Sequence, residues 1–247
     1  MRVAVISDIH GNIWALEAIL RDMADLRVEQ VINLGDILSG PLEPAATADL
    51  LMSRSWPTLH GNHDRQLLAC ESHPGIFSDQ YAYEHTTHAH RDWLRGLPSV
   101  LPLKEAGILA FHGGPSDDLT YFLEDVSPIG AAMALPDVIE QRAAGIDARL
   151  ILCGHSHKPR VVSMSGGRLV VNPGSAGLPA YDDDVPYFHV MENGSPHARY
   201  ALCQRTREPQ GWNVGLRCVA YEYEKAASAA RRHGSEKWAR WIETGRA

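Results

Sequence analysis

Five short motifs in this 247-residue chain supply the side chains that metal-assisted chemistry requires. In chain order they are Asp8-Ile9-His10, Gly35-Asp36, Gly61-Asn62-His63-Asp64, His112-Gly113-Gly114 and Gly154-His155-Ser156-His157. They offer carboxylate and carboxamide oxygens and imidazole nitrogens but no thiolate, and such a mixed site suits Mn, Fe, Co, Ni or Zn. The set is large enough for two cations, and two-metal sites catalyse in-line attack on phosphorus. The sequence therefore predicts a metal-dependent phosphoester hydrolase.

Two of these residues have predicted roles in the reaction itself. Asp36 is the best candidate to bridge two cations, because it lies between the other ligands in chain order. A hydroxide shared by the cations would attack phosphorus from the side opposite the leaving oxygen, while the cations neutralise the developing charge. His63 could protonate the departing alkoxide, and a well-placed general acid contributes about 10²–10⁴-fold.

The principal motifs follow predicted strands. Apolar runs at 2–7, 31–34 and 149–153 are typical of buried strands, and 56–60 is predicted as a further strand. Helices are expected after Asn12, at 44–54, over most of 64–97 with a break at 73–75, and at 136–144. Further strands are expected at 99–103, 107–111, 160–164, 168–171, 186–191 and 198–203. Because ligands gather beyond the carboxyl ends of strands in α/β sheets, the motifs are expected to converge.

Composition narrows the class of protein further. The net charge of −7 argues against stable nucleic-acid binding, which requires a basic face. No apolar run approaches the roughly 18 residues of a membrane helix, and no signal peptide is recognisable. The four cysteines form no C-x-x-C pair, which is typical of free thiols in a reducing compartment. We therefore expect a cytoplasmic protein without membrane contact.

The motifs resemble those of the calcineurin-like metallophosphoesterases, in particular the compact bacterial branch, over about residues 1–204. The shared pattern is Asp-x-His, Gly-Asp, Gly-Asn-His-Asp, a lone His and Gly-His-x-His, and Val171-Asn172-Pro173-Gly174-Ser175 adds to it. The resemblance implies a four-layer α/β/β/α sandwich and two divalent transition-metal ions, with Mn or Fe favoured. It implies a first-metal set of Asp8, His10, Asp36 and His157, a second-metal set of Asp36, Asn62, His112 and His155, and His63 as the catalytic histidine.

The chain is expected to divide into two parts. Residues 1–205 would form the metallophosphoesterase domain, with 64–107 as a helical insert that could cap the metals. Residues 206–247 would form a C-terminal helical extension packed on that domain. Its helix at 222–243 carries Trp238 and Trp241, three residues apart. Docking on the domain is the favoured interpretation, and a partner-binding or dimer helix in a homo-oligomer is the alternative.

The substrate is narrowed by what the motifs lack. Protein phosphatases of this superfamily carry an arginine before Gly-Asn-His, where this chain has His60. A small or nucleotide-like phosphodiester or phosphomonoester is therefore the first expectation, with Asn12 and Tyr181 as candidate substrate contacts. A dinucleoside polyphosphate hydrolase of the diadenosine tetraphosphate type is the enzymatic alternative. A catalytically silent scaffold of the same fold is the alternative from another class.

Overall fold

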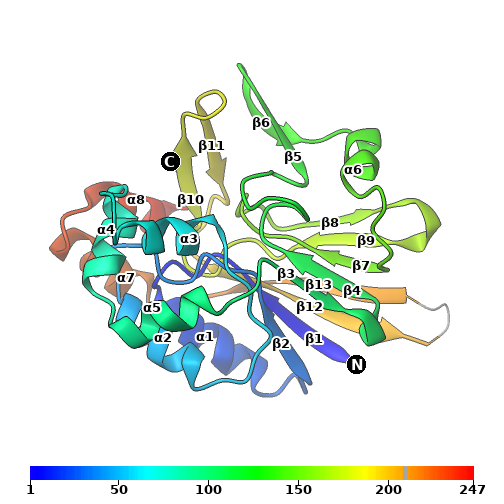
Figure 1. The fold of residues 1–247 in the computed structure, drawn as a ribbon, viewed down its shortest axis with the longest axis horizontal. Coiled ribbons are helices and arrows are strands. Elements are labelled where there is room, and N and C mark those ends of the chain that lie inside the picture. Colours follow the sequence, from blue (N-terminus) through cyan, green and yellow to red (C-terminus); the bar gives the residue numbers. More distant parts are fainter. Residues whose placement is uncertain (208–210) are drawn as a thin grey trace.

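The computed structural model describes residues 1–207 and 211–247, and two sheets form its centre (Figure 1). The first has the order β13-β12-β1-β2, with β1 (Arg2–Ile6) and β2 (Gln30–Asn33) parallel. Strands β12 (Ala198–Thr206) and β13 (Gly211–Val219) complete it as an antiparallel pair. The second has the order β3-β4-β7-β9-β8 and comprises β3 (Val100–Leu103), β4 (Ile108–Phe111), β7 (Leu150–Leu152), β8 (Arg160–Ser163) and β9 (Leu169–Asn172).

Alternation along the strands builds a core on both faces of each sheet. Val3 and Val5 of β1 are buried with Ile108 of β4 in the core between the sheets. Ala4 and Ile6 point the other way, into a core shared with the helices that cover the first sheet. These helices include α1 (Ile13–Met23), α2 (Pro44–Met52), α3 (Asn62–Ala69), α4 (Phe77–Glu84) and α5 (His88–Arg95).

The far face of the second sheet is covered by helix α6 (Pro136–Arg142). Its Ile139 is buried with Phe111 of β4 and Ile151 of β7. The predicted four-layer α/β/β/α sandwich is therefore confirmed. Two 3₁₀ turns, η1 (Lys104–Ala106) and η2 (Ser165–Gly167), interrupt the loops. Among the described residues, no helix is long and apolar enough to cross a bilayer.

Two small hairpins project beyond the sandwich and were not predicted as pairs. They are β5 (Glu124–Ser127) with β6 (Gly130–Met133), and β10 (Ala180–Asp183) with β11 (His189–Glu192). Figure 1 shows both standing away from the two sheets on the same side of the molecule. Of these four strands, only β11 overlaps a predicted strand, the one expected at 186–191.

Two other expectations are wrong. Residues 56–60 form no strand, because only Thr58 makes a bridge, to Asn33. The C-terminal extension is not wholly helical, because β13 pairs along the full length of β12. Alternating polar and apolar residues in β13 place Trp212 in the core between the sheets. The turn expected within 64–97 does fall at 73–75, between α3 and α4.

The end of the chain forms two helices instead of the single helix expected at 222–243. They are α7 (Tyr223–Arg232) and α8 (Glu236–Thr244), separated at Gly234, whose φ of 93° continues no helix. Alanines of α7 pack with Trp238 and Trp241 of α8 in a core that also includes Leu42 and Leu178. The two tryptophans therefore pack within the protein.

Candidate metal centre

The loops that carry the predicted ligands follow β1, β2, β4 and β7 and have an unusual backbone. Five of the six non-glycine residues with positive φ in the described part of the chain are predicted ligands, with φ between 52° and 66°. They are Asp8, His10, Asp36, His155 and His157. This conformation is sparsely populated, costs on the order of 1–3 kcal/mol per residue, and clusters at functional sites. The loops are therefore built to aim these side chains.

The first cluster consists of Asp8, His10 and His157. The ring nitrogens Nδ1 of His10 and His157 lie 2.8 and 2.7 Å from the carbonyl oxygens of Ser39 and Leu178. Because a carbonyl only accepts, each Nδ1 must donate, and the neutral ring then keeps its lone pair on Nε2. The two Nε2 atoms are nevertheless 3.2 Å apart, and that of His157 is 3.3 Å from Asp8 Oδ1.

Asp8 gives the sharpest test of whether a cation fits this cluster. Both of its carboxylate oxygens are buried without any hydrogen-bond donor. A buried, unsatisfied carboxylate is costly unless it is paired or coordinates a metal. Lone pairs of two imidazoles and one carboxylate thus converge on one point, as a divalent cation requires. Donation of the second ring nitrogen to a carbonyl is also the usual arrangement of metal-binding histidines.

The second cluster consists of Asp36, His112 and His155. His112 Nε2 lies 3.2 Å from Asp36 Oδ2 and 3.1 Å from Asn62 Oδ1, while its Nδ1 donates to the Leu34 carbonyl at 2.7 Å. His155 is held through Nε2, 3.0 Å from the Leu119 carbonyl. The seven predicted ligands are therefore brought together as two neighbouring groups, with His112 Nε2 only 3.9 Å from Asp8 Oδ1.

Electrostatics differ between the two groups. Burial and the neighbouring His157 lower the pKa of His10 to about 3, so His10 stays neutral and can ligate. Burial alone would lower the pKa of His112, but the charge of Asp36 raises it to about 10. Without a cation, a proton therefore lies between His112 and Asp36. A cation would replace that proton, because ligands must be deprotonated to bind.

Two glycines in the motifs are explained by close approach to Asp36. A Cβ on Gly61 would collide with Asp36 Oδ1, and a Cβ on Gly35 would collide with the backbone of Gly61. The last residue of Gly61-Asn62-His63-Asp64 is also structural, since Asp64 accepts from the backbone nitrogens of Gly61 and Ile37, both at 2.9 Å. These residues hold the β2 loop against the start of α3.

His63 lies at the edge of the centre with a partner that sequence reasoning missed. Its backbone nitrogen donates to Asp36 Oδ1 at 2.8 Å, and its Nδ1 lies 2.9 Å from Asp79 Oδ1. Asp79 is buried on α4 and also accepts from Ser39 Oγ at 2.6 Å. Burial would lower the pKa of His63, but Asp36 and Asp79 raise it to about 9. No motif or spacing in the sequence singled out Asp79.

The two expected substrate contacts have other partners. Asn12 is fully buried, caps α1 by accepting from the Ala15 nitrogen, and donates to the Gly177 carbonyl and the Tyr221 hydroxyl. Both hydrogens of its amide are engaged within the protein, and a contact between Asn12 and substrate stays a prediction. Tyr181 packs its ring edge-on against His157, with centroids 4.6 Å apart.

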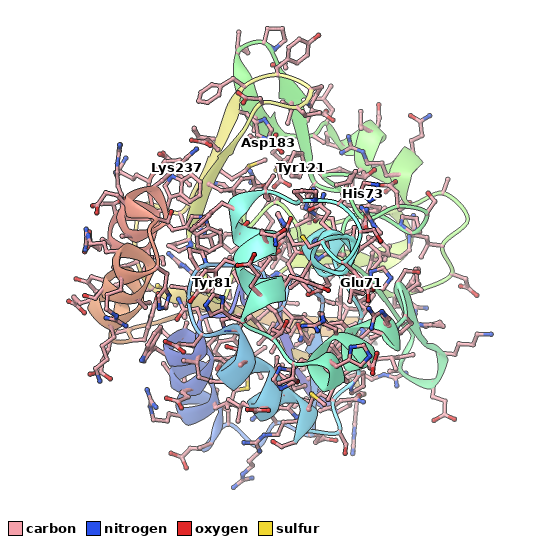
Figure 2. The ribbon with its side chains drawn as sticks, turned by 60° about the vertical axis from the view of Figure 1, so that its left-hand side comes forward. Glu71, His73, Tyr81, Tyr121, Asp183 and Lys237 are labelled. Carbon is pink, nitrogen blue, oxygen red and sulfur yellow. The ribbon has the colours of Figure 1, made fainter. Side chains whose placement is uncertain are left out.

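Tyr181 also belongs to an aromatic support for the ligands. Its hydroxyl lies 3.0 Å from the Tyr121 hydroxyl, which is 3.0 Å from His189 Nε2. The Tyr121 ring stacks on His155 with centroids 4.7 Å apart. Figure 2 shows Tyr121 near Asp183 of the hairpin formed by β10 and β11. Sequence reasoning did not find Tyr121, because it lies in a loop without a motif.

The fold and the centre together define a metal-dependent phosphoric ester hydrolase. Residues 1–193 match the family model of the calcineurin-like phosphoesterase superfamily domain, and the chain belongs to this family. The resemblance recognised in the sequence is therefore confirmed.

The chain is also similar to known proteins. An uncharacterized protein of Methanocaldococcus jannaschii is 27% identical over 199 residues, covering 72% of this chain and 76% of the relative. The fold is shared with the crystal structure of a metallophosphoesterase from Sphaerobacter thermophilus, with a TM-score of 0.76, 23% identity and 99% of each chain covered. A candidate diadenosine tetraphosphatase shares it more distantly, with a TM-score of 0.52, 15% identity, and 87% of this chain and 93% of that chain covered.

Proposed function

We propose that this chain is a dinuclear phosphoesterase that hydrolyses a small or nucleotide-like phosphodiester or phosphomonoester. One observation carries the proposal: the buried side chains of the first cluster point lone pairs at one another with no donor between them, and the second cluster lies directly beside it. The clearest case is Asp8, whose two carboxylate oxygens lack any hydrogen bond. A cation in the second cluster would replace the proton that His112 otherwise holds against Asp36.

The donor set supports a specific division of ligands. Asp8, His10, Asp36 and His157 would hold the first cation, and Asp36, Asn62, His112 and His155 the second. When bound, the cations supply Lewis acidity that polarises the phosphoryl group and activates the attacking water. The mixture of imidazole nitrogen and carboxylate oxygen suits Mn, Fe, Co, Ni or Zn, and Mn or Fe is favoured by the family resemblance. The shared position of Asp36 is supported by its charge, which acts on His10 in one group and on His112 in the other.

His63 is the proposed proton donor to the leaving oxygen. Because its Nδ1 faces Asp79, the ring is fixed with Nε2 free to carry a proton toward the substrate. Cations bound beside Asp36 would offset the charge of that carboxylate, so Asp79 is the partner that keeps His63 protonated. A correctly placed acid of this kind contributes about 10²–10⁴-fold.

A substrate panel tests the proposal. The protein is incubated with Mn²⁺ and an aryl phosphodiester, an aryl phosphomonoester, cyclic nucleotides and diadenosine tetraphosphate. We expect turnover of at least one ester by the wild type and a loss of about 10²-fold or more for Asp36→Ala and His63→Ala. Metal content and thermal unfolding of each variant distinguish a lost ligand from a misfolded chain.

The same panel separates the alternatives. Turnover restricted to diadenosine tetraphosphate would identify a dinucleoside polyphosphate hydrolase. A scaffold would turn over none of the substrates and bind no metal, and that result would overturn the proposal.

A further inference from the structure

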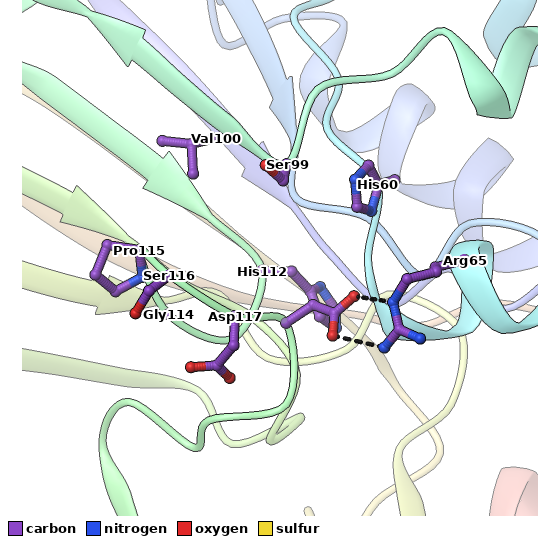
Figure 3. A pocket seen from close by; sticks show the side chains of 10 residues that line it. His60, Arg65, Ser99, Val100, His112, Gly114, Pro115, Ser116 and Asp117 are labelled. Atoms are coloured by element: carbon purple, nitrogen blue, oxygen red, sulfur yellow. Dashed lines mark hydrogen bonds and ion pairs between the residues drawn. The ribbon is translucent and has the colours of Figure 1, made fainter.

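A cavity of about 320 Å³ opens beside the metal ligand His112. Its wall includes His60, Arg65 and Ser99 on one side and the loop with Asp117 on the other (Figure 3). Asp118 also lines the cavity. This volume lies at the small end of ligand pockets, which span roughly 300–1,000 Å³. It is therefore large enough to receive a substituent of a phosphoryl group held at the second cluster.

The charged side chains that line this cavity disfavour the binding of an anion. Arg65 is the one Lys or Arg among the described residues that line it. Its Nε and Nη2 each donate to a carboxylate oxygen of Asp118 at 2.7 Å, as the dashed lines in Figure 3 show. Such a bidentate fork is the geometry with which arginine grips a phosphate. Asp118 therefore occupies the face of Arg65 that a second phosphate would need.

The loop that presents Asp118 is firmly built. Asp117 accepts from the backbone nitrogens of Leu119 and Thr120 at 3.0 and 2.7 Å, and its carbonyl accepts from Gly114 at 2.7 Å. The backbone of Asp118 packs so closely on Gly113 that a Cβ there would lie 2.6 Å from the Asp118 carbonyl carbon. Asp118 is thus held in place by its own loop as well as by Arg65.

We propose that Asp118 is a specificity-determining residue that keeps Arg65 from binding anionic substituents, so that the cavity selects an uncharged, polar substituent. Substrates whose reacting phosphoryl group carries a nucleoside or another hydroxyl-rich group fit this cavity. Substrates in which further phosphates follow the reacting phosphoryl group do not fit this cavity. A second phosphate would have to displace Asp118 from Arg65 and would leave the Asp118 carboxylate unpaired beside an anion. This inference rests on the proposed phosphoesterase function and names its substrate class.

Two adenosine compounds test the inference. In adenylyl-(3′→5′)-adenosine, both substituents on the phosphorus are uncharged nucleosides. In diadenosine tetraphosphate, the substituents on each phosphorus include further phosphates. We expect the wild type to have the higher kcat/KM for the first compound. Asp118→Asn keeps the shape of the side chain and removes its charge, and should shift the ratio toward the tetraphosphate by about tenfold, the worth of one charge-assisted contact.

Binding provides a readout that does not depend on turnover. Calorimetry with ADP and with adenosine measures affinity for a charged and an uncharged substituent. Asp118→Asn should strengthen ADP binding by about tenfold relative to adenosine. Adding Arg65→Ala to Asp118→Asn should remove this gain, because the freed guanidinium is its source.

Glu71→Gln is the matched control. Glu71 is an exposed carboxylate that pairs with Arg95 at 2.6 Å, so it changes the net charge equally without touching the cavity. Its substrate and binding ratios should equal those of the wild type. The inference is overturned if Asp118→Asn leaves both ratios unchanged, if Glu71→Gln shifts them equally, or if the wild type prefers the tetraphosphate. If no ester is hydrolysed at all, the proposed function fails, and the calorimetric ratio still decides the role of Asp118.

Discussion

Replacing Asp79 by Asn tests the proposed role of His63 without removing any metal ligand. Asp79 is 1% exposed and its Oδ1 accepts from both His63 Nδ1 at 2.9 Å and Ser39 Oγ at 2.6 Å. The substitution keeps the size of the side chain but removes the charge that favours protonated His63. A hydrogen bond to a charged group is worth about 1.5–3 kcal/mol, which corresponds to roughly 10–150-fold in rate.

The assay compares two phosphodiesters that differ in the leaving group. A nitrophenolate departs without help from an acid, whereas an alkoxide requires a proton. We therefore expect Asp79→Asn to lower kcat for the alkyl ester by about 10–150-fold and to change the nitrophenyl ester much less. Ser39→Ala is the control, because it removes the other hydrogen bond to Asp79 and leaves the contact with His63. Equal losses for both esters, or a fall in bound metal, would show that Asp79 does not act through the proton on His63.

Three further predictions concern metal binding and stability. Gly61→Ala should abolish metal binding in calorimetry, because the added Cβ would collide with Asp36 Oδ1. Gly96→Ala is the control and should bind metal as the wild type does, since a Cβ on Gly96 would meet no atom closer than 3.4 Å. Trp238→Ala should lower the free energy of unfolding by about 3–5 kcal/mol in denaturant titration, because it opens a cavity among buried residues. A loss below about 1 kcal/mol would contradict the packing of Trp238 described above. Asp22→Asn should destabilise the protein at pH 7. Burial raises the pKa of Asp22, but the hydrogen bonds from Arg217 and Tyr200 outweigh the effect of burial, so the pKa in the folded protein lies below its ordinary value. The stabilisation by Asp22 is present above the ordinary carboxyl pKa of about 4 and is lost as the pH falls through the lower pKa of the folded state. The free energies of unfolding of the wild type and of Asp22→Asn should therefore become equal in acid. A difference between them that persists in acid would contradict this prediction.

The sequence was informative where short motifs coincide with strand ends. Asp8, Asp36, His112 and His155 could be predicted to lie together because apolar runs precede them and their residue types belong to one kind of chemistry. The four layers could be expected from the family resemblance. The positive φ of five of the predicted ligands could not be predicted, because aspartate and histidine adopt that conformation more often than most residues but still only occasionally.

Residues that act through tertiary contacts could not be found from the sequence. Asp79 lies sixteen positions after His63 on another helix, and only the packing of α3 on α4 brings them together. The hydrogen bonds of Asn12 could not be predicted for the same reason, since its partners Gly177 and Tyr221 are distant in the chain. Strand β13 was missed although its apolar residues alternate with polar residues or glycine from Trp212 to Cys218, which is the pattern of a half-buried strand.

Anomalous diffraction at the manganese edge from a Mn²⁺-soaked crystal would locate the bound cations. We expect two peaks, one among Asp8, His10 and His157 and the other among Asp36, His112 and His155. No peak in either group at saturating Mn²⁺, or peaks confined to surface carboxylates, would contradict this expectation.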